Sequence, residues 1–200
     1  MLVGKTLAML NTRKSAPDSP LTWVNTMTSI RNHRYSTNRL IVDEWHSLTH
    51  ADWPTQDLPK LVMDIPSERV TLSLPPAWQG PYTCARAHQW IRDRDNESIT
   101  LLAVEKASQK AIGIVIVFEA DNDGNVRLGY LLDETAWGKG FASELVGGFV
   151  EWCRDHHIIS ITGGVERGNV ASARVLEKCG FVAEPTTGES DEQLFKMVLA

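Results

Sequence analysis

The chain has 200 residues, a length that fits one domain with a sizeable hydrophobic core. Hydrophobic residues make up 42% of it and charged residues 22%, which is typical of a soluble globular protein. The net charge of −5, with no basic stripe to offset it, argues against direct binding of nucleic acid. No apolar run approaches the roughly 18 residues that span a bilayer, so we expect no membrane partner. Three cysteines without CxxC spacing, Cys84, Cys153 and Cys179, predict reduced thiols in a cytoplasmic protein.

Residues 1–37 differ in composition from the rest of the chain. They are rich in Ser, Thr, Asn and basic residues, and Pro17 and Pro20 would interrupt any helix. We expect an N-terminal extension here, partly disordered or lying against the domain or a partner subunit. Residues 38–200 then form a single domain.

From Arg39 onward, apolar runs alternate with polar turns. Two β-rich runs joined by a short polar turn predict a hairpin, and a tight turn at Asp123 and Gly124 leads into a third antiparallel strand. The elements expected in this part are a strand at 39–45, a short helix at 58–63, an irregular loop at 74–81, a helix at 82–94, and strands at 99–104, 111–118 and 126–132.

The last third of the chain continues with helices and strands in alternation. Asn169 is a good N-cap for a helix, and Gly180 is suited to terminate that helix. The whole order predicts an α+β fold: a mixed, mostly antiparallel central sheet of about six to seven strands, flanked by helices. The elements expected here are an amphipathic helix after Gly140, a strand at 158–165, a helix from Asn169 to Cys179, and a strand at 193–199.

The most informative segment is residues 134–143, which joins a predicted strand to the helix after Gly140. Its Gly-x-Gly turn, Gly138 and Gly140, exposes backbone N–H groups beside the positive end of the helix dipole, an arrangement suited to phosphate. Because glycine has no Cβ, a phosphate can come close and φ can be positive at little cost. Two glycines at this spacing also occur in purely structural turns, so the motif gains its meaning from the rest of the chain.

Three segments together resemble the GCN5-related N-acetyltransferases, the GNAT superfamily. They read Gly-Tyr-Leu-Leu at 129–132, Trp-Gly-Lys-Gly-Phe-Ala at 137–142, and Asn-Val-Ala-Ser-Ala-Arg-Val-Leu-Glu-Lys-Cys-Gly-Phe at 169–181. The branch that looks most similar is the RimJ/RimL type, which acetylates ribosomal-protein N-termini or other amines. The likeness covers roughly residues 37–199. It implies acetyl-CoA as the donor, no metal, and a primary amine as the acceptor, either a protein N-terminus or a small molecule, and it makes a homodimer plausible.

The resemblance also implies a cofactor site between two splayed parallel strands, where the thioester enters. The pantetheine arm would pair with the backbone of residues 130–132, and an N–H of Leu131 or Leu132 would polarise the thioester carbonyl. The turn at 137–142 would hold the pyrophosphate, with Lys139 adding charge, and Asn169 would meet the pantetheine. The cofactor-binding residues implied in this way are Tyr130, Leu131, Leu132, Trp137, Gly138, Lys139, Gly140, Phe141, Ala142, Asn169 and Ser172.

The catalytic groups depart from the usual pattern of the family. Many members carry a tyrosine, the general acid, at the position of Leu176, and this chain does not. Ser172 is the substitute that could protonate the CoA thiolate or donate a hydrogen bond to it. Relatives often use a glutamate just ahead of the Gly-Tyr pair, where Arg127 stands here. Glu119 and Glu166 remain candidates for the general base, acting through a bridging water.

Two other positions bear on the site. Thr135 stands where a glutamine or arginine usually opens the Gly-x-Gly motif, which removes one phosphate contact but leaves the backbone cradle. Trp78, in a Pro-rich loop, is expected to line the acceptor entrance. His46 and His50 lie four residues apart without a third ligand, so we expect packing or surface histidines rather than a metal site.

Each candidate residue also has a structural interpretation: core strand at 130–132, a helix cap at Asn169, a helix-turn serine at Ser172, and solvated charges at the glutamates. The leading hypothesis is nonetheless an enzyme, an N-acetyltransferase in which an amine attacks acetyl-CoA directly. The alternative is a non-catalytic module that binds acyl-CoA as a sensed ligand. The missing tyrosine and Arg127 keep that alternative open.

Overall fold

The computed structural model describes residues 33–50, 57–119, 124–185 and 191–199, with the side chains of residues 48–50 and 119 left out. Its elements in chain order are β1 (Tyr35–Ser36), β2 (Leu40–Glu44), α3 (Trp45–His50), α4 (Leu58–Asp64), α5 (Glu68–Thr71), the 3-10 helix η1 (Pro76–Trp78), α6 (Cys84–Glu97), β3 (Ile99–Glu105), β4 (Lys110–Glu119), β5 (Asn125–Leu132), the 3-10 helix η2 (Glu134–Ala136), α7 (Phe141–Asp155), β6 (Ser160–Glu166), α8 (Val170–Lys178), β7 (Val182–Ala183) and β8 (Glu192–Val198).

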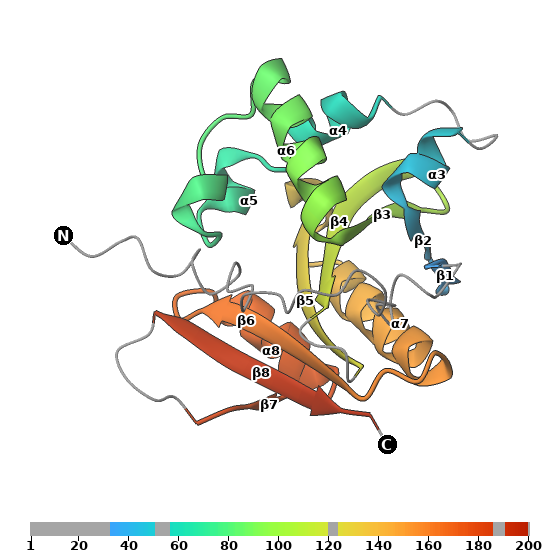
Figure 1. The fold of residues 1–200 in the computed structure, drawn as a ribbon, viewed down its shortest axis with the longest axis vertical. Coiled ribbons are helices and arrows are strands. Elements are labelled where there is room, and N and C mark those ends of the chain that lie inside the picture. Colours follow the sequence, from blue (N-terminus) through green and yellow to red (C-terminus); the bar gives the residue numbers. More distant parts are fainter. Residues whose placement is uncertain (1–32, 51–56, 120–123, 186–190, 200) are drawn as a thin grey trace, which may run out of the picture.

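The strands form one sheet in the order β1-β2-β3-β4-β5-β6-β8-β7 (Figure 1). Every neighbouring pair in it is antiparallel except β5 and β6, which are parallel. The predicted α+β class and the mostly antiparallel sheet are therefore confirmed. The sheet has eight strands rather than six to seven because two edge strands, β1 and β7, are only two residues long, too short to leave a periodic sequence pattern.

Helices cover both faces of the sheet, and each face has its own hydrophobic core. Side chains alternate along β4, so Val115 and Val117 enter one core while Ile114 and Ile116 enter the other. The first core packs against α7 and α8, and we call this side of the sheet the α7 face. The second packs against α3, α4, α5 and α6 and is called the α6 face (Figure 1).

Local sequence signals explain how the last two long helices begin and end. Asn169 caps α8 by accepting a hydrogen bond from the Ser172 N–H at 3.1 Å, as predicted. Gly180 follows the helix with φ of 93°, a conformation that favours glycine, and so ends it. Helix α7 starts directly after Gly140, and its apolar stripe faces the core.

Other elements differ from the sequence expectation. The helix predicted at 82–94 is α6, which starts at Cys84 because the Thr83 side chain caps it by accepting from the Arg86 N–H. It continues past residue 94 to Glu97. Helices α3 and α5 were not predicted, and the loop at 74–81 contains a 3-10 turn. The predicted turn at Asp123 and Gly124 lies partly outside the described residues.

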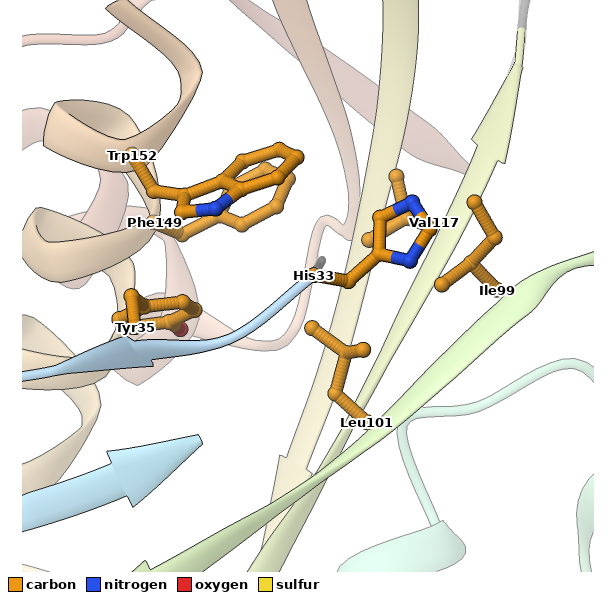
Figure 2. Close-up of a pocket in the computed structure, with 7 residues that line it drawn as sticks. All are labelled: His33, Tyr35, Ile99, Leu101, Val117, Phe149 and Trp152. Carbon is orange, nitrogen blue, oxygen red and sulfur yellow. The ribbon is translucent and has the colours of Figure 1, made fainter. Parts of the chain in front are cut away.

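Residues 33–37 lie against the domain, whereas residues 1–32 fall outside the described part of the chain. Tyr35 is buried, and its hydroxyl donates to the Leu145 carbonyl of α7 at 3.0 Å. Figure 2 shows Tyr35 and His33 beside Phe149 and Trp152 of α7, around an internal gap too narrow to hold a water molecule. This N-terminal segment is thus part of the α7 core.

No helix among the described residues has both the length and the apolar character needed to cross a membrane. Cys84, Cys153 and Cys179 are free thiols. Burial raises the pKa of Cys179, so its thiol keeps its proton at neutral pH.

Two adjacent glycines of α7 offer a matched test of the packing between α7 and β1. A Cβ on Gly148 would lie 2.6 Å from Thr37 Cγ2 and 2.8 Å from a Tyr35 ring carbon, whereas a Cβ on Gly147 would meet nothing within 4 Å. Gly148→Ala should therefore lower the free energy of unfolding by about 1 to 2 kcal/mol through overpacking. Gly147→Ala should raise it by about 0.5 to 1 kcal/mol through helix propensity. Urea unfolding of both variants measures this, and equal shifts of the same sign would contradict the packing described.

Candidate active site

β5 and β6 separate before either strand ends. Their parallel pairing stops where Leu128 lies opposite Gly163, yet β5 continues to Leu132 and β6 to Glu166. The strands diverge beyond that point and leave a fork (Figure 1). Backbone groups that point into the fork have no neighbouring strand to pair with. This is the divergence that the sequence resemblance implied.

Strand alternation decides which backbone groups point into the fork. The Asp133 N–H donates to the Ile112 carbonyl at 2.9 Å, which fixes the hydrogen-bonding phase between β4 and the end of β5. In an antiparallel pair alternate residues bond to the partner strand and the others point away. Leu131 therefore bonds to β4, while the N–H and C=O groups of Tyr130 and Leu132 point into the fork. The sequence resemblance implied that the N–H of Leu131 or Leu132 polarises the thioester. The Leu132 N–H is the one that faces the fork.

Trp137, in the glycine turn, forms a hydrogen bond with one of these backbone groups. Trp137 Nε1 donates to the Leu132 carbonyl at 2.9 Å, so the turn folds back over the end of β5. The indole is 42% exposed, and the Arg69 guanidinium lies 5.5 Å from its ring centroid. Glu134 forms an ion pair with Arg69 at 2.9 Å and accepts a hydrogen bond from the Ser67 hydroxyl at 2.5 Å. These contacts join α5 to the turn, and no sequence pattern predicts them.

The turn itself forms an open cradle at the start of α7. Gly138 and Gly140 have φ of 70° and 80°, the left-handed region that favours glycine. No side chain caps α7, so the N–H groups of its first turn are open to an external acceptor. A Cβ on Gly138 would meet no atom of the described residues within 4 Å, so they leave space above the turn. Lys139 is exposed at the same place.

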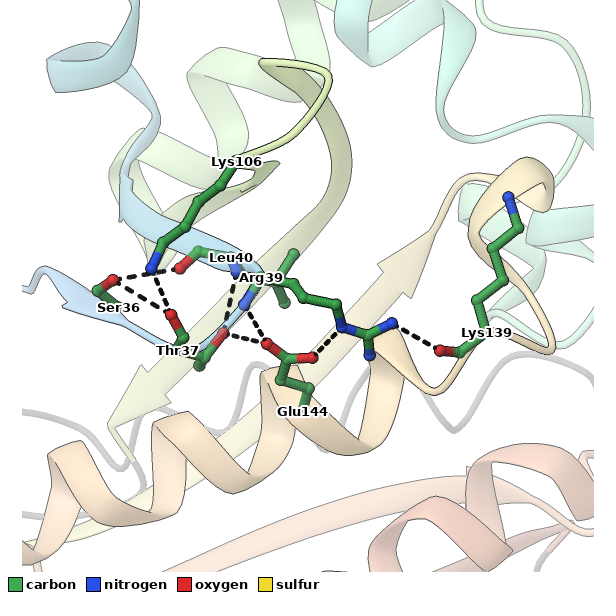
Figure 3. Close-up of polar contacts among 7 residues, drawn as sticks. All are labelled: Ser36, Thr37, Arg39, Leu40, Lys106, Lys139 and Glu144. Atoms are coloured by element: carbon green, nitrogen blue, oxygen red, sulfur yellow. Dashed lines mark hydrogen bonds and ion pairs between the residues drawn. The ribbon is translucent and has the colours of Figure 1, made fainter.

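A cluster of polar contacts holds this cradle in position (Figure 3). Glu144, in the first turn of α7, accepts hydrogen bonds of 2.6 Å from the Thr37 hydroxyl, the Arg39 N–H and the Arg39 Nε. Arg39 also donates to the Lys139 carbonyl at 3.0 Å, and its guanidinium lies 4.2 Å from the centroid of the buried Phe141 ring. Two residues just before β2, Thr37 and Arg39, thus fix the turn that precedes α7.

The same contacts set the charge state of Glu144. Burial alone would raise the pKa of Glu144, but the hydrogen bonds from Thr37 and Arg39, together with the Arg39 charge, outweigh it. The pKa therefore lies below its ordinary value. The carboxylate stays ionised and keeps all three donors in place.

Helix α8 forms the second wall of the fork on the α7 face. Asn169 and Ser172 lie half-buried in its first turn. Leu176, one turn further on, is 2% exposed and packs on the strand, since a Cβ on Gly163 would lie 3.1 Å from its Cδ1. The Asn169 side-chain oxygen is engaged in capping, which leaves its amide group as a donor. Ala142, in the facing turn of α7, packs against the same core.

Tyr130 places a hydroxyl between these walls. Burial raises the pKa of Tyr130 to about 12, and the nearby Ser172 side chain offsets part of that rise. The Tyr130 oxygen is nevertheless buried without a hydrogen-bond partner among the described residues. A buried hydroxyl without a partner is costly, so this atom is suited to meet a ligand.

These observations fit acetyl-CoA as the ligand. The uncapped start of α7 and the space above Gly138 suit a pyrophosphate, because N–H groups at a helix start bind phosphate oxygens. Open backbone groups at Tyr130 and Leu132 suit the amides of a pantetheine arm. The hydroxyl of Tyr130 supplies one further polar contact at the fork.

Charged side chains line the mouth of the fork on the opposite, α6 face. Glu192 of β8 lies opposite Glu166 of β6, and its side chain reaches back along the sheet. A Cβ on Gly164 would be only 1.9 Å from Glu192 Oε1, so the carboxylate lies over Gly164, the first β6 residue beyond the pairing with β5. Arg127 lies 3.9 Å from the other oxygen of Glu192. The register of the sheet creates this cluster, which the sequence alone did not reveal.

The two predicted base candidates are less well placed than Glu192. Glu166 is exposed at the end of β6. The side chain of Glu119 lies outside the described residues, and its backbone pairs with Val126, about 13 Å along β5 from Tyr130. Both assignments stay predictions.

Trp78 lies on the α6 face, in an aromatic cluster. Its ring is half-buried, 5.7 Å from Trp90, and the Arg94 guanidinium lies 4.7 Å from it. Arg94 also lies 5.7 Å from Phe118, which pairs opposite Arg127. The loop at 74–81 thus contributes a packed tryptophan, on the same face as the charged mouth. The predicted role of Trp78 at the acceptor entrance stays a prediction.

The tether at Glu144 gives a pH-dependent prediction. Glu144→Gln should lower the free energy of unfolding at pH 7 by about 1 to 2 kcal/mol, since hydrogen bonds to a charged group are lost. Because the pKa of Glu144 in the folded protein is depressed, its contribution is complete above the unfolded pKa near 4.3 and is lost as the pH falls further. Urea unfolding should show the difference from wild type closing below about pH 4. Glu177→Gln, at an exposed position of α8, is the control; a pH-independent deficit at Glu144 would contradict the ionic tether.

Comparisons with known proteins agree with this geometry. A family model described as an acetyltransferase (GNAT) domain matches residues 48–182, about two thirds of the chain. The comparison with curated proteins gives no match.

Among solved structures, a GNAT-family acetyltransferase from Bacillus anthracis is similar with a TM-score of 0.69 and 15% identity, over 82% of this chain and 98% of that one. A spermidine N-acetyltransferase from Vibrio cholerae, solved with CoA and spermine, has a TM-score of 0.64 and 15% identity, over 80% and 96%. A ribosomal-protein-S5-alanine acetyltransferase from Vibrio fischeri has a TM-score of 0.56 and 18% identity, over 83% and 96%. At these identities the likeness shows the fold. Taken with the family model, it shows that the chain belongs to the GNAT family of acetyltransferases and is an N-acetyltransferase.

Proposed function

We propose that the chain transfers an acetyl group from acetyl-CoA to a primary amine by direct attack of the amine on the thioester. The observation that carries the proposal is the fork between β5 and β6, which opens beside the uncapped start of α7. One extended ligand can then place phosphates on the turn at Gly138 and Gly140 and a thioester in the fork. The Trp137 contact with Leu132 brings these two places together.

On the α7 face, the chain binds and orients the donor. The N–H groups of the first turn of α7 hold the pyrophosphate, and Tyr130 pairs with the pantetheine through its backbone. The Leu132 N–H, which faces the fork, donates to the thioester oxygen as negative charge develops there. Ser172 donates a hydrogen bond to the departing sulfur. No metal takes part in these steps.

On the α6 face, the chain receives the amine. Glu192 is the proposed base, because its carboxylate lies over Gly164 at the mouth of the fork. It takes a proton from the attacking nitrogen directly or through a water, while the nitrogen forms the bond to the acetyl carbon and the sulfur leaves with its electron pair. An α-amine, with a pKa near 8, needs only modest help at neutral pH.

The Arg127 guanidinium at the mouth is the feature that favours a peptide N-terminus over a polyamine as the acceptor. The Arg127 guanidinium lies beside Glu192 and, within the described ranges, has that one ionic contact. A polyamine would bring several positive charges towards it, whereas a peptide N-terminus brings one and carries carbonyl groups that Arg127 can bind. A RimJ/RimL-type acceptor, such as a ribosomal-protein N-terminus, is therefore part of the proposal. A cytoplasmic location is also proposed, because the three cysteines without CxxC spacing are typical of reduced thiols.

The cradle is tested by Gly138→Val. A β-branched residue at φ of 70° is strained, and its side chain fills the space above the turn. Calorimetry should show coenzyme A affinity reduced at least tenfold. Gly147→Ala, which adds a methyl group to the same helix in open space, should keep wild-type affinity. Equal affinity in all three proteins would refute the phosphate assignment.

Turnover is tested with acetyl-CoA and a panel of amines that includes an alanine-initiated peptide and spermidine. Thiol release and product mass should identify the peptide as the faster acceptor. Glu192→Gln should lower kcat/KM by about 10² to 10⁴ and remove the acidic limb of the pH profile, as expected for loss of a general base. Glu166→Gln, at its exposed neighbour, compares the two candidate bases.

The same experiment can contradict the proposal. Thermal stabilisation by coenzyme A without thiol release from any amine would favour the binding module that only senses acyl-CoA. A larger loss in Glu166→Gln than in Glu192→Gln would move the base to Glu166.

A further inference from the structure

Four side-chain polar atoms in the described part of the chain are buried without a hydrogen-bond partner: Trp90 Nε1, Arg94 Nε, Tyr130 Oη and Trp152 Nε1. Trp90 and Arg94 lie in the aromatic cluster of the α6 face, and Trp152 lies beside the narrow gap in the α7 core. Tyr130 differs because it is located at the fork. Its hydroxyl is therefore the unpaired atom that a ligand in the fork could meet.

The position of Tyr130 follows from the register of the sheet. Leu128 is the last residue of β5 that pairs with β6, and Tyr130 is the next residue whose side chain points to the α7 face. Its ring packs against that core, which fixes the direction of the hydroxyl. The Ser172 side chain, in the first turn of α8, lies close enough to act on the Tyr130 hydroxyl.

The two hydroxyls lie near one another without forming a hydrogen bond. Tyr130 Oη has no partner, and Ser172 uses its backbone N–H, not its hydroxyl, to bond Asn169. Two adjacent donors that do not bond to each other can share a third atom as acceptor. At the fork, that acceptor would be the sulfur of the thioester, which gains negative charge as the carbon–sulfur bond breaks.

Helix α8 contains no tyrosine whose hydroxyl could donate a hydrogen bond to the sulfur. Position 176 holds a leucine that is 2% exposed and packs over Gly163. We propose that Tyr130, from strand β5, is a further catalytic residue of the transfer: its hydroxyl and that of Ser172 together donate hydrogen bonds to the departing CoA sulfur. The inference rests on the proposed function. The sulfur leaves with the electron pair of the broken bond and takes its proton from water, while both hydroxyls keep their protons.

A retained phenol proton is consistent with the environment of Tyr130. Burial raises its pKa to about 12, so it remains a donor at neutral pH. Cys179 is the other titratable group that acts on it, and burial raises the pKa of that thiol as well. Neither group becomes an anion that would repel the thiolate.

Tyr130→Phe tests the proposal because it keeps the ring and removes one oxygen. The free variant should unfold about 2 to 6 °C higher than wild type, since a buried hydroxyl without a partner is removed. Its kcat should fall about 10- to 100-fold with KM for acetyl-CoA within twofold. Tyr35→Phe is the matched control: that hydroxyl bonds the Leu145 carbonyl, so the variant should unfold at a lower temperature and keep its kcat.

A binding measurement separates this inference from the proposed function. At pH 9, wild type should bind coenzyme A more tightly than desulfo-coenzyme A, because the two hydroxyls favour the thiolate, and Tyr130→Phe should lose most of that preference. Loss of the preference supports the inference even if no amine is acetylated. Wild-type kcat and preference in Tyr130→Phe would overturn it, as would a rise in KM alone, which would assign the hydroxyl to the pantetheine arm.

Discussion

Hydrogen bonding between β5 and β6 stops after Leu128 and Gly163, although both strands continue. A strand that loses its neighbour exposes N–H and C=O groups, and buried groups of this kind need partners. The rest of the site depends on this constraint. Tyr130 and Leu132 present those groups to the fork, α8 closes it on one face, and Arg127 and Glu192 border it on the other.

The turn before α7 must leave its N–H groups open to a ligand and must still be held in one position. A turn that binds phosphate cannot cap its own helix, because a capping side chain would occupy the N–H groups that the ligand needs. Its rigidity therefore comes from outside. Glu144 holds Thr37 and Arg39, and Trp137 bonds the end of β5. Gly138 and Gly140 adopt their positive φ angles at little cost, so the turn needs only these outside contacts to stay in place.

The sequence predicted the elements whose signals are local. Asn169 as a helix cap, Gly180 as a terminator and the hairpin of β3 and β4 all follow from short-range rules, and the structure confirms them. Helices α3 and α5 were missed because they are only six and four residues long, and so short a helix is specified by packing more than by its own pattern.

The parts of the site that join distant segments could not be predicted. The carboxylate of Glu192 lies over Gly164 only because β8 pairs with β6 in one register. The unpaired hydroxyl of Tyr130 depends on the absence of an acceptor around it, which no pattern of residues encodes. The turn at 137–142 was recognisable because its glycines lie close together and are accompanied by the motifs at 129–132 and 169–181.

The Arg39 contacts have a consequence for how the protein is made. Arg39 is synthesised 105 residues before Glu144, so the turn cannot reach its final shape until most of the chain has left the ribosome. The donor site then forms only after a contact across 105 residues has been made, rather than as an early local unit. Coenzyme A affinity in this protein would accordingly report completion of the whole fold.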